Sequence, residues 1–201
     1  MIVNPARHMA GLAVALGLLA ASPVLAADGK QLFEDKGCTA CHGEDANTPL
    51  EPGYPRLAGQ NADYAFTQLK DIKAGVRTNG LTADTMKPIL EEVTEDEMRA
   101  LADYLASLPR LAKATEKSTL PGQKLYMTKT CVACHGKDGL KPVLKSYPFV
   151  GGQDQKYILT QIMDIKTGKR VNGLTKAMEP VMHLVKDEEI AAIAEFLANV
   201  K

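Results

Sequence analysis

Apolar residues recur at helical spacing along much of the chain. After Asn61, a plausible helix N-cap, Ala65, Leu69 and Ile72 lie on one face of a helix that Gly75 would end. No window alternates between apolar and polar residues for long enough to predict a strand. The pattern therefore predicts an all-α protein.

Other helix boundaries carry their own signals. Thr94 and Glu97 have the spacing of a capping box, and an apolar stripe over residues 98–105 follows them. A similar stripe follows Asp187, and residues 29–37 have the pattern of a short helix. The loops between these segments are long and rich in Pro and Gly, which is typical of loops that wrap a bound group.

The second part of the chain repeats the first at an offset of 93 residues. Residues 29–82 align with residues 122–175, and 26 of the 54 aligned positions are identical. Such a repeat indicates a duplicated domain. We therefore expect a first domain over 27–108, a linker over 109–121 and a second domain over 122–201. Recurring blocks include Tyr54-Pro55 as Tyr147-Pro148, Gly59-Gln60 as Gly152-Gln153, Asp71-Ile72-Lys73 as Asp164-Ile165-Lys166, and Arg77-x-Asn79-Gly80-Leu81-Thr82 as Arg170-x-Asn172-Gly173-Leu174-Thr175.

Residues 1–26 have the pattern of a secretory signal peptide. Arg7 and His8 precede an apolar run of about 13 residues, and small residues up to Ala26 offer a cleavage site. The run is shorter than the ~20 residues that a membrane-spanning helix needs, although an uncleaved N-terminal anchor is the alternative. The sequence therefore predicts export to the periplasm and a mature chain that begins at Ala27.

Composition narrows the class of protein. Hydrophobic residues make up 45% and charged residues 24% of the chain, which is typical of globular proteins. The 24 basic and 24 acidic residues balance, so nothing indicates a nucleic-acid partner. Aromatic residues reach only 5% and Trp is absent, and we therefore expect a bound group to complete the core.

The candidate chemistry lies in two copies of the pattern Cys-x-x-Cys-His. This is the attachment signal for c-type haem, in which both thiols form thioethers and the imidazole ligates iron. A zinc site gives no reason for a His after each Cys pair, a thioredoxin-like pair requires a βαβ setting, and structural disulfides would not repeat the His. Two haems are therefore expected, on Cys38, Cys41 and His42 and on Cys131, Cys134 and His135.

The sixth ligand of each iron is predicted from the repeat. Once a one-residue gap is allowed, Met86 matches Met178, and each precedes a Pro by two residues. No other Met of residues 27–201 has a Met in the equivalent position, so we expect these two to be axial ligands; the alternative is that they fill the core. His183 has no His counterpart and is expected at the surface.

Further contacts to the haem groups are predicted around these ligands. Pro55 and Pro148 each lie 13 residues after a motif His, and their carbonyl oxygens are candidate acceptors for the second imidazole nitrogen. Arg77 and Arg170 are candidates to pair with haem propionates, and solvated arginines at helix ends are the alternative.

These motifs resemble the dihaem cytochrome c4 family, which consists of two tandem class I cytochrome c domains. In that fold a small residue and an aromatic of the N-terminal helix cross the C-terminal helix; Gly29 with Phe33 and Gly122 with Tyr126 match this, opposite Tyr104 and Phe196. The resemblance implies a small helical fold around each covalently bound haem, His/Met ligation, and no catalytic residues.

The resemblance also implies a periplasmic electron carrier between a quinol-oxidising complex and a terminal oxidase. Its expected partners are redox proteins, other cytochromes included, with no small-molecule substrate and possible peripheral membrane association. Two alternatives stay open: a dihaem subunit of a flavin-containing sulfide-oxidising complex, and a dihaem peroxidase or thiosulfate-oxidising enzyme. The enzyme requires an open iron position, which matching Met residues argue against.

The two halves carry opposite charge. Residues 27–110 contain 9 basic and 15 acidic residues, a net charge of −6, whereas residues 111–201 contain 14 basic and 9 acidic residues, a net charge of +5. One interpretation is that the two ends dock different redox partners through complementary charge. The other is that opposite charge draws the two halves together.

Overall fold

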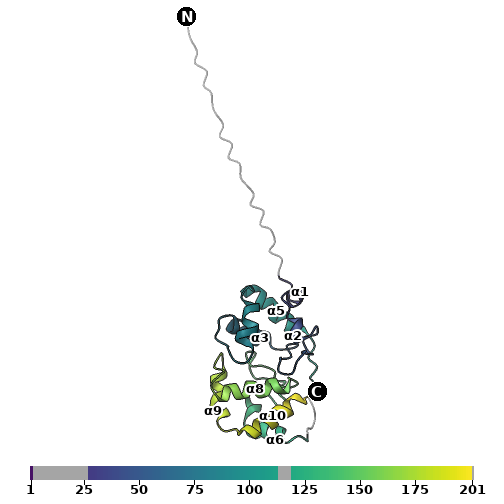
Figure 1. Cartoon of the computed structure of the whole chain (residues 1–201), viewed down its shortest axis with the longest axis vertical. Coiled ribbons are helices and arrows are strands. Elements are labelled where there is room, and N and C mark those ends of the chain that lie inside the picture. Colours follow the sequence, from purple (N-terminus) through teal and green to yellow (C-terminus); the bar gives the residue numbers. More distant parts are fainter. Residues whose placement is uncertain (2–26, 113–118, 201) are drawn as a thin grey trace.

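The computed structural model describes Met1 and residues 27–112 and 119–200, and the predicted signal peptide beyond Met1 lies outside this part of the chain (Figure 1). The described residues form helices joined by loops, with one isolated bridge between Pro52 and Tyr54 and no β-strand. None of the described helices is long and apolar enough to cross a membrane. The all-α prediction is confirmed.

The two halves contain equivalent series of elements, except that α9 of the second half takes the place of the turn η1 and α4 of the first. The first half consists of α1 (Gly29–Asp35), α2 (Thr39–His42), α3 (Ala62–Lys73), the π-helical turn η1 (Thr82–Met86), α4 (Lys87–Leu90) and α5 (Glu95–Ser107). The second half consists of α6 (Pro121–Thr128), α7 (Cys131–His135), α8 (Gln155–Lys166), α9 (Thr175–Met182) and α10 (Asp187–Ala198). The halves stack on one another, with α3 and α8 between them (Figure 1).

The crossing of the first and last helix organises each half. Gly29 of α1 faces the backbone of Ala100 and the Cβ of Tyr104 in α5, and Gly122 of α6 faces Ala192 and Phe196 in α10 in the same way. The missing Cβ lets the helices approach closely, as the resemblance implied.

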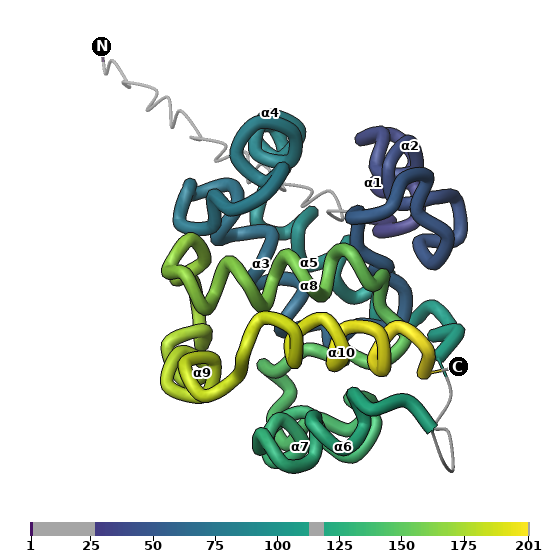
Figure 2. The backbone as a smooth tube through the Cα atoms, turned by 60° about the horizontal axis from the view of Figure 1, so that its bottom comes forward, coloured from purple at the N-terminus to yellow at the C-terminus, as the bar shows by residue number. Residues whose placement is uncertain are grey.

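An aromatic pair packs at the crossing of the first and last helix in each half. The ring centroids of Phe33 and Tyr104 lie 5.9 Å apart, and those of Tyr126 and Phe196 lie 5.6 Å apart. Both pairs are tilted at 53°, a favourable aromatic geometry. Figure 2 shows α10 running beside α8, so that the last helix also supports the helix that faces the first half.

Most predicted caps are present, with one informative difference. The Thr94 hydroxyl accepts from Glu97 N while the Glu97 carboxylate accepts from Thr94 N, which completes the capping box of α5. Asn61 is the N-cap residue that precedes α3, but its side chain makes no capping hydrogen bond. Its amide donates instead to the carbonyl oxygen of Tyr147 in the other half, because α3 begins at the contact between the halves.

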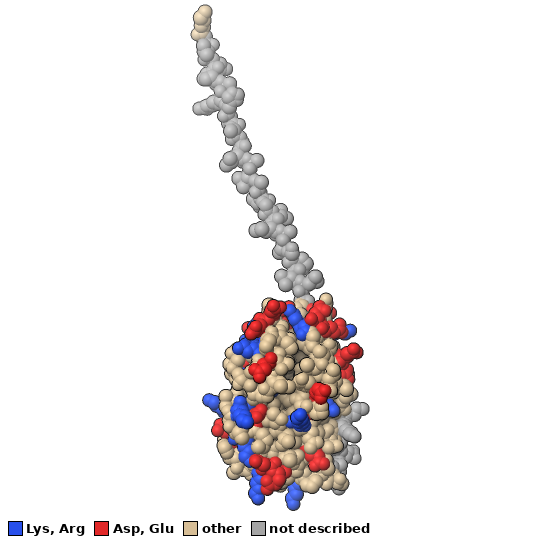
Figure 3. Space-filling model, in the orientation of Figure 1, with Lys and Arg blue, Asp and Glu red and all other residues tan. Residues whose placement is uncertain are grey.

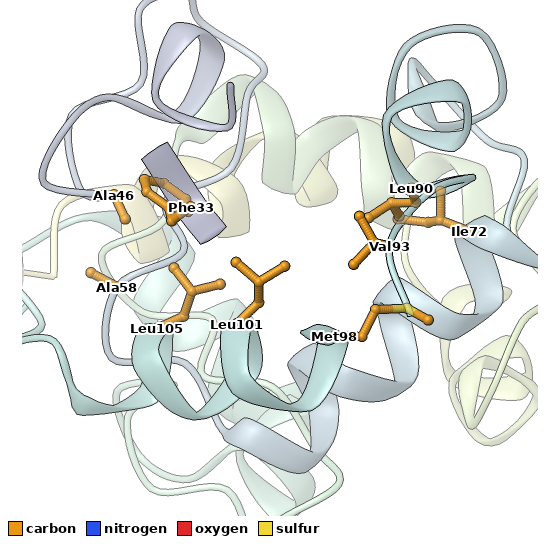
Figure 4. Packing of buried hydrophobic residues seen from close by; sticks show 9 residues of the cluster. All are labelled: Phe33, Ala46, Ala58, Ile72, Leu90, Val93, Met98, Leu101 and Leu105. Carbon is orange, nitrogen blue, oxygen red and sulfur yellow. The ribbon is translucent and has the colours of Figure 1, made fainter. Parts of the chain in front are cut away.

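The core of the first half surrounds a central space rather than filling it. Figure 4 shows its buried side chains in two groups, with Phe33, Leu101 and Leu105 on one side and Ile72, Leu90 and Val93 on the other. The second half has an equivalent cluster around Tyr126, Ile190 and Phe196.

Among the residues that the structure describes, no ion pair joins the halves. Each ion pair formed among residues 27–112 and 119–200 lies within one half, as with Lys70–Glu95 and Lys166–Asp187. Acidic side chains gather over the upper end of the first half, whereas both signs are mixed over the second (Figure 3). The opposite net charges therefore do not draw the halves together through direct ion pairs.

The tight crossing of α6 and α10 makes Gly122 sensitive to any side chain. We expect Gly122→Ala to lower the free energy of unfolding by about 1–3 kcal/mol, because its Cβ would overlap the backbone of Ala192. Lys124→Ala, at an exposed position of the same helix, is the control and should change stability little. Denaturant unfolding measures both, and equal effects would contradict the close approach of these helices.

Candidate functional site

The two Cys-x-x-Cys-His motifs fold as single helical turns. Cys38 caps α2 and His42 ends it, while α7 runs from Cys131 to His135. One helical turn brings residues three and four apart onto one face, so both thiols and the imidazole of each motif can meet one ligand. The four cysteines form no disulfide, and no three His, Cys, Asp or Glu side chains of the described part of the chain gather as a metal site. Neither observation favours the disulfide or zinc interpretations.

Both motif histidines are buried and oriented by a backbone oxygen. Nδ1 of His42 lies 3.0 Å from the carbonyl oxygen of Pro55, and Nδ1 of His135 lies 3.2 Å from that of Pro148. Burial lowers the pKa of both imidazoles, which keeps them neutral near pH 7. With Nδ1–H donating to the carbonyl, Nε2 is the nitrogen that is free to ligate a metal.

Three of the four motif thiols are half-buried, and in the second motif the first thiol lies deeper than the second. Burial raises the pKa of Cys38 and of Cys131 to about 11, so both are protonated thiols at neutral pH before any covalent bond forms. Cys134 is exposed, whereas Cys41 is half-buried. The second motif therefore extends closer to the surface than the first.

One cavity connects the two motifs. Its volume is about 620 Å³, and His42, Met86, His135 and Met178 all line it. Leu, Ile, Val, Phe and Pro side chains make up much of the remaining wall, which suits a flat apolar macrocycle. Each half thus supplies one neutral imidazole and one thioether to the same cavity, and the residues present fit haem.

The elements that carry the two Met residues explain the gap in the repeat. Met86 ends the π-helical turn η1, four residues after Thr82, whereas Met178 lies in α9, three residues after Thr175. A π-helical turn accommodates one extra residue in a helix. The first half therefore keeps its Met on the cavity wall despite the additional residue.

Arg77 and Arg170 are buried between the halves rather than solvated, with exposures of 6% and 8%. Nη2 of Arg77 donates to Tyr157 Oη (3.1 Å) and Gln161 Oε1 (3.0 Å) of the other half, and its Nη1 donates to Gln68 Oε1 (3.0 Å). Both guanidinium groups also line the cavity.

Arg170 makes the mirror-image set. Its Nη2 donates to Tyr64 Oη (3.2 Å) and Gln68 Oε1 (3.0 Å), and its Nη1 donates to Gln161 Oε1 (2.9 Å). The two arginines thus make equivalent bonds, which relates the two halves by an approximate twofold axis.

Asparagines extend this network. Asn79 donates to Gln161 and Asp164, and Asn172 donates to Gln68 and Asp71. Sequence reasoning did not assign these residues a role, although the signal was present. Tyr64, Gln68 and Asp71 share a helical face and are identical in the two repeats, which is unusual for polar positions unless they meet a partner.

The comparisons with known proteins agree with this geometry. The cytochrome c family model matches residues 26–109 and 120–201, one match on each half. The chain belongs to the cytochrome c family.

Known proteins match the chain over both of its halves. The chain is 32% identical over 169 residues to cytochrome c4 of Pseudomonas aeruginosa, which covers 80% of this chain and 82% of the relative. It is 33% identical over 207 residues to a thiosulfate dehydrogenase electron acceptor of Stutzerimonas stutzeri, with 94% of both chains covered. The crystal structure of reduced recombinant cytochrome c4 from Pseudomonas stutzeri matches with a TM-score of 0.71 at 26% identity, over 86% of this chain and 97% of that one. The protein is a tandem cytochrome c of the cytochrome c4 type, and its two motifs imply two covalently bound haem c groups.

The arginine network should be needed for stability. We expect Arg77→Leu to leave the buried Tyr157 Oη without its donor, to remove one of three donors each from Gln68 Oε1 and Gln161 Oε1, and to lower the free energy of unfolding by about 1–3 kcal/mol. Arg99→Leu, which removes surface ion pairs to Asp63 and Asp103 and a cation–π contact with the Phe66 ring, is the control and should cost about 1 kcal/mol. Denaturant unfolding of the haem-loaded proteins compares the two, and a cost for Arg77→Leu no larger than the control would refute the role of the network.

Proposed function

We propose that this cytochrome is a periplasmic electron carrier whose two irons are both ligated by His and Met. The observation that carries this proposal is that each half contributes one neutral His and one Met to the wall of the same cavity. His42 with Met86, and His135 with Met178, are the ligand pairs. The haem iron supplies a one-electron couple between its ferric and ferrous states.

The chain's own residues favour transfer over catalysis. With Met86 and Met178 as ligands beside His42 and His135, neither iron would keep an open position for oxygen, peroxide or another substrate. No catalytic residue is therefore assigned, and the alternative of a dihaem peroxidase or thiosulfate-oxidising enzyme is not favoured.

Arg77 and Arg170 are proposed to hold the haem propionates. Each guanidinium has five N–H groups. Four of them are used in each arginine, by Asn79, Gln68, Tyr157 and Gln161 for Arg77 and by their repeat equivalents for Arg170. Neither arginine takes part in an ion pair among the described residues. Because a buried charge requires a countercharge, a propionate at the remaining N–H is a fitting partner.

The pathway and location are further parts of the proposal. The signal-peptide pattern of residues 1–26 supports export to the periplasm. There the protein would take electrons from a quinol-oxidising complex and deliver them to a terminal oxidase or another cytochrome, at the membrane surface or free of it.

A second candidate donor is favoured by the relatives. Thiosulfate dehydrogenase electron acceptors from two organisms are 33% and 30% identical to this chain over 94% and 82% of its length. In this alternative a thiosulfate dehydrogenase reduces the cytochrome. Stopped-flow mixing of the oxidised protein with each reduced donor separates the two: the physiological donor should reduce both haems at the higher second-order rate.

The proposed ligation makes a specific prediction for single Met variants. We expect Met86→Ala to remove half of the ferric Met–iron charge-transfer absorption, to lower the reduction potential of one haem and to let that haem bind carbon monoxide when reduced. Met178→Ala should do the same to the other haem.

Met127→Leu is the control, because Met127 is 44% exposed and does not line the cavity. It should keep both charge-transfer bands. A Met86→Ala protein that retains the full band would contradict Met86 as a ligand.

A further inference from the structure

The repeated Gly-Gln pair anchors a side chain that crosses between the halves. Gly59 and Gly152 have φ angles of +67° and +72°, in the left-handed region that favours glycine. Their N–H groups donate to the carbonyl oxygens of Leu105 and Leu197 at 2.7 Å, at the end of the last helix of their own half. The glutamine that follows each glycine thus starts from a fixed backbone.

Each glutamine side chain binds one backbone residue of the opposite half at two points. Gln60 Nε2 donates to the carbonyl oxygen of Phe149 (3.0 Å), and Phe149 N donates to Gln60 Oε1 (2.8 Å). Gln153 Nε2 donates to the carbonyl oxygen of Arg56 (2.8 Å), and Arg56 N donates to Gln153 Oε1 (2.6 Å). Both glutamines are buried, with exposures of 8% and 5%.

The bound residues directly follow the prolines that orient the haem-ligating histidines. The N–H of Phe149 belongs to the same planar peptide group as the carbonyl of Pro148, which accepts from His135. The N–H of Arg56 likewise shares a peptide group with the carbonyl of Pro55, which accepts from His42. Each such peptide is held on one side by an imidazole of its own half and on the other by a glutamine of the opposite half.

The glutamine bonds to this peptide affect the hydrogen bond of the histidine as well as the position of the loop. A peptide that donates through its N–H has a more strongly polarised carbonyl oxygen, and hydrogen bonds in such chains strengthen one another. A stronger acceptor at Nδ1–H makes the imidazole a more basic ligand, which favours the ferric over the ferrous iron.

We propose that Gln60 and Gln153 are positioning residues for the haem site of the opposite half: Gln60 sets the His135–Pro148 hydrogen bond, and Gln153 sets the His42–Pro55 hydrogen bond. The inference rests on the proposed ligation of iron by these histidines. It makes the reduction potential of each haem depend on a side chain of the other domain.

The test is the effect of Gln60→Leu on the haem-loaded, ferrous, ¹⁵N-labelled protein. The Nδ1–H resonance of His135 should move upfield and exchange faster with solvent, because its acceptor is weakened, while that of His42 stays unchanged. The reduction potential of the second-half haem, followed through its own haem methyl signals in a redox titration, should rise. Gln153→Leu should give the mirror-image result, affecting His42 and the first-half haem only.

A matched control separates this role from a loosened interface. Asn172→Ala removes bonds to Gln68 and Asp71 across the same contact, and the bond that it accepts from Arg170, but touches neither Pro peptide, so both Nδ1–H resonances should stay in place. Equal shifts of both histidines in Gln60→Leu, or the same shift in Asn172→Ala, would overturn the inference. Should either glutamine variant fail to load both haems, the other still gives the decisive comparison.

The wild-type spectrum tests the proposed function independently. Two Nδ1–H resonances strongly displaced by haem ring currents indicate that both histidines ligate iron. Their absence would count against the proposed ligation itself, whereas their presence with no shift in either variant would count against the glutamines alone.

Discussion

Neither half of this protein fills its own interior with side chains, and the rest of the structure follows from that constraint. The buried residues of the first half, such as Phe33, Leu101 and Leu90, border a cavity that continues into the second half. Small domains of this size gain little from their own cores, so a bound apolar group has a large share in their stability. Two haems supply the apolar mass that a chain without Trp lacks.

The contact between the halves follows from the same duplication. Both halves carry the same polar residues on α3 and α8. A residue that binds a partner in its own half therefore also binds the equivalent of that partner in the other half, as Arg77 binds Gln161 and Arg170 binds Gln68. In the described part of the chain, hydrogen bonds to buried guanidinium and amide groups make this contact, and no ion pair does. It is also the wall of the cavity, so the stability of the assembly and the surroundings of both haems depend on the same side chains.

The sequence was sufficient for the fold, because helical periodicity, capping signals and a strong internal repeat all indicated the same architecture. Gly29 with Phe33 and Gly122 with Tyr126 cross the last helices as the family resemblance implied. The contact between the halves was not foreseen, because identical polar residues do not reveal whether they face a ligand, solvent or their own copies. Arg77 illustrates this: it was considered only as a propionate partner or a solvated residue, and it is buried against the other half.

The central claim is that a His and a Met ligate each of the two irons and leave no open position. An optical redox titration of the haem-loaded protein tests this claim most directly. The titration would follow the ferric Met–iron charge-transfer band together with the two haem reduction steps, and would then expose the reduced protein to carbon monoxide. The account predicts two haems per chain, the band on both, and no ready binding of carbon monoxide. A haem that lacks the band and binds carbon monoxide would contradict it, because that iron would be open to a substrate.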